Sequence, residues 1–310
     1  MGWTTADIPD LSGRIAVVTG GNGGLGLEVA RELARKRAHV VIAARDAAKS
    51  AAARGAITTE IPDASLDVRS LDLASLDSVV EAAAAILDAY GVVDVLVNNA
   101  GVMATPEQQT HDGFEMQFGV NHLGHFALTA LLWPSLLRSD GPRVVSVTST
   151  GRHFGPAVNP DNPHLKGGYD PWRAYGQSKL ANVHFALELD RRIRDAGLPA
   201  KSVVVHPGFA KTDLQARSVR ESEGGRSQRF FHDAVRRTGM TPARAALSLL
   251  RAAIDPEAEG GTLYTPRWVN WGPPVRRPLL RRSRNRAAMA TLWEVSEGET
   301  GIVFDVEPIA

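Results

Sequence analysis

Residues 14–26 read RIAVVTGGNGGLG, and this stretch decides the fold. Its first part, RIAVVT, is mostly apolar and β-branched, which predicts a buried strand. The glycines that follow permit a tight turn, and residues 25–37 then place apolar side chains at helical spacing. Such a turn is typical of a phosphate-binding loop, because the helix N-terminus offers free N–H groups and the positive end of its dipole to an anion.

The same alternation of strand-like and helix-like segments continues along the chain. Further strands are predicted at 39–43, 66–71, 94–97, 143–148 and 202–205, and helices at 46–55, 75–90, 113–138 and 174–195. Apolar strands separated by helices lie parallel and are buried on both faces. We therefore predict an α/β protein with an open, doubly wound sheet.

The composition excludes several classes of protein. The chain has 310 residues, of which 44% are hydrophobic and 22% charged, as in an ordinary globular protein. A net charge of +1 gives no argument for binding nucleic acid or a membrane. With no cysteine, the chain cannot form a disulfide, a thiolate metal site or a Cys nucleophile, which fits a cytoplasmic location. No apolar run is long enough to span a membrane.

We predict that residues 1–310 form one domain. Residues 1–13 are interpreted as an N-terminal extension and residues 266–310 as a C-terminal extension. Apolar side chains between 209 and 240 suggest a lid over an apolar substrate, and the alternative is that these side chains pack in the core.

A second unusual segment lies inside the C-terminal extension. Residues 267–286 hold seven Arg and no acidic residue. We expect a solvated basic loop. The alternative is a patch for an anionic substrate or an acidic carrier protein.

Polar and small residues at the predicted strand ends are candidates for binding a dinucleotide. Arg45 ends the second strand without an acid before it, and Arg is suited to a 2′-phosphate, so NADP(H) is favoured over NAD(H). Asp72 could bond an adenine amino group, or simply be a loop acid. The candidate cofactor-binding residues from these four strand ends are Gly20, Asn22, Gly24, Leu25, Gly26, Arg45, Asp72, Leu73, Asn98, Ala100 and Gly101.

The fifth strand and the following long helix supply candidates for catalysis. Ser149 comes directly after the strand. Tyr175 and Lys179 are four residues apart and so share one helix face. A nearby ammonium stabilises tyrosinate, and a Tyr so tuned can donate or accept a proton at a carbinol oxygen.

These motifs together resemble the short-chain dehydrogenase/reductase family. The resemblance covers residues 14–265 through TGGNGGLG at 19–26, NNAG at 98–101, Ser149 and YGQSK at 175–179. The tail LWEVSEGETG at 292–301 and the run YGQSKLAN at 175–182 extend it toward the branch of the family that resembles retinol dehydrogenases and the WW-domain oxidoreductase. The resemblance implies a Rossmann-type sheet of about seven parallel strands flanked by helices.

The resemblance also implies roles for individual residues. Tyr175 would be the catalytic acid/base and Ser149 would orient and polarise the substrate carbonyl. Lys179 would hold the nicotinamide ribose and lower the Tyr175 pKa, and Asn121 would hold a relay water near it. The residues that would cover the nicotinamide carboxamide are Pro207, Gly208 and Thr212.

We therefore expect an NADP(H)-dependent oxidoreductase that interconverts a carbonyl and an alcohol on an apolar small molecule, without a metal or nucleic-acid partner. Homo-oligomer formation is left open. Two alternatives also stay open: an isomerase or lyase that uses NAD(P) transiently, and a cofactor-sensing regulator without turnover. Ser149 and Tyr175 are separated by a long interval, which predicts an inserted loop at 152–173 beside the active site.

Overall fold

The computed structural model describes residues 2–211, 233 and 235–308. At its centre is a sheet of eight strands in the order β3-β2-β1-β4-β5-β6-β7-β8. Strands β1 to β7 run parallel, and β8 pairs antiparallel with β7. The strands are β1 (Ile15–Thr19), β2 (His39–Ala44), β3 (Leu66–Ser70), β4 (Val95–Asn98), β5 (Arg143–Val147), β6 (Lys201–Val205), β7 (Leu263–Pro266) and β8 (Pro274–Arg277). The predicted doubly wound parallel sheet is confirmed, with one antiparallel strand added at its edge.

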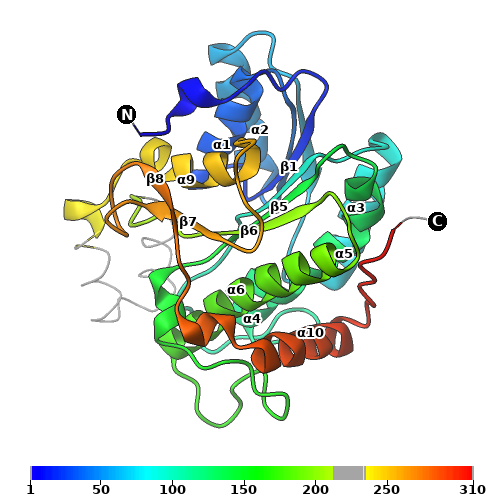
Figure 1. The fold of residues 1–310 in the computed structure, drawn as a ribbon, viewed down its shortest axis with the longest axis vertical. Helices are drawn as coiled ribbons and strands as arrows, with labels where there is room; N and C mark the ends of the chain where they lie inside the picture. The colour runs from blue at the N-terminus through cyan, green and yellow to red at the C-terminus, as the bar shows by residue number, and fades with distance from the viewer. Residues whose placement is uncertain (1, 212–232, 234, 309–310) are drawn as a thin grey trace.

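Helices cover both faces of the sheet (Figure 1). One face carries α1 (Gly24–Arg35), α2 (Ala47–Glu60) and α9 (Pro242–Ile254). The other carries α3 (Leu76–Ala89), α5 (Gly124–Leu137) and α6 (Pro171–Asp195), and α10 (Arg286–Thr300) packs on the outside of α6. In the described part of the chain, no helix combines the length and the hydropathy needed to cross a membrane.

The chain reverses its direction of growth across the sheet at β1. This strand pairs with β2 on one side and with β4 on the other. In open parallel sheets, the crevice beyond the carboxyl ends of the strands at such a reversal is where ligands bind. The fold therefore points to the ends of β1 and β4.

Polar caps set the starts of three helices that flank this crevice. Asp46 accepts a hydrogen bond from the Lys49 amide at 3.0 Å and begins α2. Ser75 caps α3, as its position in the sequence predicts. Asp170 caps α6, so this helix starts at Pro171, three residues before the predicted start.

The predicted single helix over 113–138 is wrong in its start and in its regularity. Glu115 accepts the Gln117 and Phe118 amides, and α4 (Met116–Phe118) begins after this cap. A π-helical turn, η2 (Gly119–Leu123), follows before α5. Because a π-turn adds a residue to the helical repeat, it rotates the side chains at its centre, and such turns often occur at functional sites.

The arginine-rich segment is not the loop that the composition predicts. Residues 274–277 form β8, whose Arg276 lies opposite Tyr264 of β7. The short helix η4 (Arg281–Arg284) then leads into α10. Pairing with β7 supplies the backbone hydrogen bonds that composition alone does not reveal.

Candidate active site

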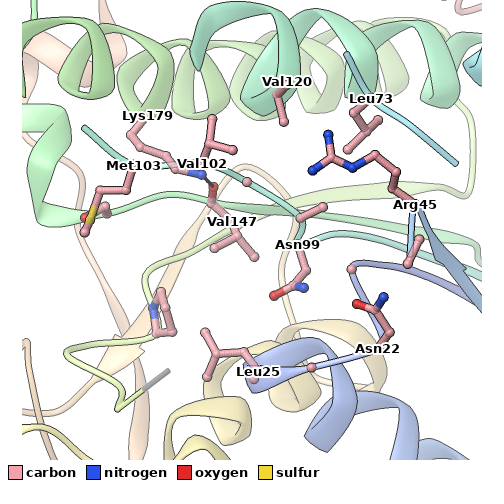
Figure 2. Close-up of a pocket in the computed structure, with 18 of the residues that line it drawn as sticks. Asn22, Leu25, Arg45, Leu73, Asn99, Val102, Met103, Val120, Val147 and Lys179 are labelled. Carbon is pink, nitrogen blue, oxygen red and sulfur yellow. Dashed lines mark hydrogen bonds between the residues drawn. The ribbon is translucent and has the colours of Figure 1, made fainter. Parts of the chain in front are cut away.

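A cavity of about 570 Å³ opens at the carboxyl ends of the strands. Figure 2 shows Arg45, Leu73 and Asn22 toward one end and Lys179 and Met103 toward the other. This volume is in the range of small-molecule and cofactor sites. The predicted residues that line it are Gly20, Asn22, Gly24, Leu25, Arg45, Asp72, Leu73, Ala100, Gly101, Ser149, Tyr175, Lys179, Pro207 and Gly208.

Three further predicted site residues do not line this cavity. Gly26, Asn98 and Asn121 are buried behind its wall. Thr212 lies outside the described residues, as does most of the predicted lid at 209–240, namely residues 212–232 and 234.

The glycines of the first turn bring the backbone close to the neighbouring strand. Gly20 has a φ of +65°, and a Cβ there would lie 3.1 Å from the Ala100 Cα. A Cβ at Gly26 would lie 2.3 Å from the Gly20 carbonyl oxygen, so Gly26 serves the packing of the turn itself. At Gly23, by contrast, a Cβ would meet nothing within 4 Å, which leaves the turn open toward the cavity.

The N-terminus of α1 fits a pyrophosphate. Gly23 is its N-cap and offers no side chain to cap the first amides, and the first turn holds no acidic residue. These amides and the helix dipole therefore remain available to an anion in the cavity. The donor set matches the phosphates of a dinucleotide.

Thr19 joins the ends of β1 and β4. Its Oγ1 accepts hydrogen bonds from the amides of Asn99 at 2.9 Å and Ala100 at 3.0 Å. The Asn99 side chain donates to the Thr19 carbonyl at 2.8 Å. Asn99 therefore ties the two neighbouring strands together, whereas Asn98 turns away and donates to Thr129 of α5 at 3.0 Å.

A buried histidine that the sequence analysis did not assign completes this junction. His125 Nε2 lies 2.9 Å from Thr19 Oγ1, and its Nδ1 lies 3.1 Å from the carbonyl oxygen of Asn121. Nδ1–H can only donate to that carbonyl, so Nε2 accepts from Thr19. Burial lowers the pKa of His125 to about 4, which keeps the ring neutral for this arrangement. Its position four residues after Asn121 is the signal that could have found it.

Asn121 holds the segment after β4 to α6. Its Oδ1 accepts the Val102 amide at 2.8 Å, and its Nδ2 donates to the Val102 carbonyl at 3.0 Å and to Ser178 Oγ at 2.9 Å. The π-turn aims this side chain across the gap. Asn121 is therefore a positioning residue for the wall beside Lys179, because a Cβ at Gly101 would lie 2.7 Å from its Oδ1 and 3.3 Å from Lys179 Nζ.

Ser149, Tyr175 and Lys179 meet at the second end of the cavity. A hydrogen bond from the Ser149 hydroxyl lowers the Tyr175 pKa, but burial has the larger effect and raises that pKa to about 12. The Lys179 Nζ lies 5.9 Å from the centre of the Tyr175 ring and donates to the Val147 carbonyl at 3.4 Å. Burial also lowers the pKa of Lys179 to about 8.

The pKa of Tyr175 is thus shifted in the opposite direction to the one that the resemblance implies. Burial disfavours the charged form of both groups, so it raises the pKa of Tyr175 and lowers the pKa of Lys179. The protein alone keeps Tyr175 protonated at neutral pH.

The predicted inserted loop packs directly on the turn of α6 that carries Tyr175. A Cβ at Gly176 would lie 2.3 Å from the Gly155 amide nitrogen, so the two backbones touch. A Cβ at Gly151 would lie 2.8 Å from the Tyr175 ring. These glycines let the loop reach the active-site helix and fix the ring between them.

At the other end, the cavity wall is charged and exposed. Arg45 Nη1 lies 3.5 Å from Asp72 Oδ2, and Lys49 Nζ lies 3.8 Å from Asp46 Oδ2. Arg45 and Lys49 both line the cavity. These exposed ion pairs are weak, so either cation can turn to an anionic ligand.

Comparisons with known proteins agree with this geometry. A family model described as short chain dehydrogenase matches residues 14–223. Human retinol dehydrogenase 11 is 36% identical over 297 residues, which are 95% of this chain and 88% of that protein. Human retinol dehydrogenase 13 is 44% identical over 204 residues, 66% of this chain and 61% of that protein. A crystal structure of an uncharacterized protein from Mycobacterium paratuberculosis has a TM-score of 0.79 and 38% identity, and covers 98% of this chain and 100% of that one.

Proposed function

The chain belongs to the short-chain dehydrogenase/reductase family, and we propose that it interconverts a carbonyl and an alcohol on an apolar substrate with NADP(H) as its cofactor. Membership of this family, together with its retinol dehydrogenase relatives, makes it an NAD(P)-dependent oxidoreductase of alcohol and carbonyl groups. The preference for NADP(H), the apolar substrate and the residue roles are the parts that we propose.

One observation carries the proposal. Ser149, Tyr175 and Lys179 line one end of the same cavity whose other end holds the α1 N-terminus and Arg45. A dinucleotide laid across the strand ends would reach from the cations to the Tyr175 hydroxyl. Bound NADPH would supply the hydride that the substrate carbon gains in reduction, and bound NADP+ would accept the hydride that it loses in oxidation.

The side chains of this end are suited to moving the matching proton. In reduction, the Ser149 and Tyr175 hydroxyls donate to the substrate oxygen as negative charge develops on it. Tyr175 then transfers its proton to that oxygen and is protonated again from water. A Tyr175 pKa of about 12 means that the proton is in place at neutral pH. In oxidation Tyr175 accepts the proton instead, which requires its deprotonated form.

The cofactor preference depends on Arg45 and Lys49. Both cations line the cavity where the second strand ends, and Asp46, the acid that follows Arg45, is engaged as the cap of α2. A 2′-phosphate would meet two cations at this end, and a guanidinium binds such a group with two parallel hydrogen bonds. We propose that this difference favours NADP(H) over NAD(H).

The apolar substrate is supported by the wall around Lys179 and by the relatives. Val102, Met103 and Val147 line the cavity there. The two human relatives described above are named for retinol, a long apolar alcohol. We propose a substrate of this class, an apolar alcohol and its aldehyde or ketone.

Replacing Tyr175 by Phe tests the mechanism. The change removes only the proton donor, so turnover should fall by roughly 10²–10⁴-fold, the usual contribution of a positioned acid or base. NADPH binding, followed by fluorescence titration, should stay unchanged. Tyr264→Phe is the matched control, because Tyr264 is equally buried but lies outside the cavity wall. Full activity in Tyr175→Phe would overturn the mechanism.

Product analysis separates this proposal from the two alternatives. An oxidoreductase consumes the cofactor mole for mole, whereas an isomerase or lyase needs only a catalytic amount. A cofactor sensor binds NADPH and reduces nothing in a panel of aldehydes, steroids and retinoids.

We also propose that the whole chain acts as one domain, since the sheet runs from β1 to β8 and α10 packs on α6. We propose the cytoplasm as its location, because the chain has no cysteine.

A further inference from the structure

The turn between β7 and β8 exposes large apolar side chains. Trp268 is 58% exposed, Val269 40% and Trp271 56%. The two indole rings lie 6.5 Å apart, centre to centre. We call residues 268–271 the tryptophan tip. Single exposed apolar residues are ordinary, but two tryptophans and a valine on one projecting turn form a patch that needs an explanation.

The tryptophan tip is held in this conformation by its own backbone. The Trp268 amide donates to the Trp271 carbonyl at 3.0 Å, and the Val269 amide donates to the Pro266 carbonyl at 2.8 Å. Val269 has a φ of +69°, a conformation that a β-branched residue rarely adopts. The rings are therefore presented to solvent by an ordered turn, which lowers the entropy that they would lose on binding.

Cations follow the tip along the chain. Seven Arg and no acidic residue occur between 267 and 286, and all seven are exposed. In Figure 1 the chain runs from the β7–β8 hairpin along one flank of the molecule to η4. Four of these arginines have no ion pair or side-chain hydrogen bond to any described residue, and we call them the arginine flank: Arg267, Arg281, Arg284 and Arg286.

The tryptophan tip also adjoins the cavity. A Cβ at Gly208, which lines the cavity, would lie 2.8 Å from the Asn270 carbonyl oxygen. Burial lowers the pKa of His206 in the same wall, and the Asn270 side chain raises that pKa by a smaller amount. The residue at the centre of the tip is thus part of the wall beside the β6 end.

We propose that the tryptophan tip and the arginine flank bind the surface of an anionic lipid bilayer. Indole rings prefer the boundary between headgroups and acyl chains, and arginines contact anionic headgroups. Such binding lies on the surface and needs no membrane-spanning segment. It would bring the β6 end of the cavity to the bilayer, where an apolar substrate dissolves. This last consequence rests on the proposed function, whereas the binding itself does not.

The charge of the patch favours a bilayer over a second copy of this chain. A symmetric dimer brings the same patch of both copies together, and it would oppose unpaired arginines with unpaired arginines. An acidic protein partner would match the charge, but a tip that projects its rings from a tight turn suits insertion into a soft interface. The small net charge of the whole chain conceals this local excess of cations.

Flotation with vesicles tests the proposal on the full chain. We expect binding to vesicles with 30% phosphatidylglycerol in phosphatidylcholine, weaker binding in high salt, and little binding to phosphatidylcholine alone. Changing Trp268 and Trp271 to Ser should weaken binding by roughly tenfold or more, because the buried apolar area is lost. Changing Arg267, Arg281 and Arg284 to Gln should weaken it by a similar or larger factor. A blue shift of tryptophan fluorescence on binding should disappear in the Trp variant.

Matched controls separate this patch from general stickiness or charge. Val80→Ser with Leu87→Ser removes exposed apolar side chains from α3, and a triple Gln variant of Arg54, Arg138 and Arg244 removes three exposed cations elsewhere. Both controls should bind like the wild type. The proposal is wrong if the wild type binds no anionic vesicle or if the controls lose as much binding. It is also wrong if the chain binds soluble polyglutamate as tightly, or forms a lipid-free dimer that the same Trp variant dissolves. Activity on a water-soluble aldehyde should be equal in all variants, so a failed substrate proposal is recognised separately.

Discussion

The two ends of the cavity differ in how far their polar groups are exposed to water. At the Arg45 end the charged groups are exposed and paired across 3.5 Å, so water screens them and none has to be neutral. At the Tyr175 end the polar groups are buried, and burial alone raises the pKa of Tyr175 to about 12 and lowers that of Lys179 to about 8. The cations at the exposed end can therefore exchange one anionic partner for another at a small cost in free energy. At the buried end, the protonation states of Tyr175 and Lys179 are set by burial. We expect substitutions at the Arg45 end to change the cofactor preference and substitutions at the Tyr175 end to abolish the reaction.

After Tyr175→Phe, the largest effect should come from Lys179→Met. Lys179 is the buried cation beside Tyr175, and a methionine keeps the apolar stem while it removes the charge and the donor. We expect kcat to fall by roughly 10²-fold or more, as for other groups that act on a proton transfer. Steady-state kinetics with saturating NADPH measure this, and Lys166→Met on the exposed loop is the control. A drop confined to KM for NADPH would show that Lys179 only binds the cofactor.

The next effect is on stability as a function of pH. Lys179 has a pKa of about 8 in the folded protein against 10.5 for an ordinary lysine. Between these values the unfolded chain binds more protons than the folded one, so Lys179 makes the protein more stable as pH rises from 8 to 10.5. The change approaches about 3 kcal/mol, at about 1.4 kcal/mol for each pH unit. Urea unfolding should show that the free energy of unfolding of the wild type rises by this amount relative to that of Lys179→Met as pH goes from 8 to 10.5. A difference between the two proteins that does not change with pH would contradict the assignment.

At the exposed end, Arg45→Asp should exchange the cofactor preference. The change removes the guanidinium and adds a carboxylate, which repels a 2′-phosphate and can bond a 2′-hydroxyl. We expect the ratio of kcat/KM for NADPH over NADH to fall by roughly ten- to hundredfold, the range of a charge-assisted hydrogen bond. Arg54→Asp, on the exposed surface of α2, is the charge-matched control. An unchanged ratio would remove Arg45 from the cofactor proposal.

The sequence was sufficient for the parts of the site that depend on local spacing. The glycine-rich turn and Ser149 closely follow the strands that place them, and Tyr175 and Lys179 lie on one face of α6. Asn121 and His125 differ, because their partners Val102, Ser178 and Thr19 lie far along the chain and meet them only through a π-turn. Helical periodicity relates His125 to Asn121 four residues before it, but it does not reveal the distant partners of either side chain. Strand β8 was not predicted for a similar reason. Its arginines are typical of a solvated loop, and only its pairing with β7 makes it a strand.

The smallest effect contrasts two buried arginines, one with a nearby carboxylate and one without. Arg152 is 7% exposed, donates to the Ser149 carbonyl at 2.9 Å and has no carboxylate partner among the described residues, and burial lowers its pKa to about 10. Arg143 is 8% exposed, donates to the Ala252 carbonyl at 3.2 Å, and lies near Asp255, which raises its pKa against the effect of burial. A buried charge with no counter-charge destabilises a fold, whereas a nearby carboxylate such as Asp255 offsets part of that cost for Arg143.

We therefore expect Arg152→Met to raise the melting temperature by a few degrees, about 1 kcal/mol, and Arg143→Met to lower it. Thermal unfolding at pH 7 measures both. If Arg152→Met is also less active, then the buried cation is retained for the placement of Ser149 and not for stability, because its Nη1 holds the carbonyl of that residue. A loss of stability in Arg152→Met as large as in Arg143→Met would show that a compensating anion lies against Arg152, and the buried end of the cavity would then be better neutralised than its described residues indicate.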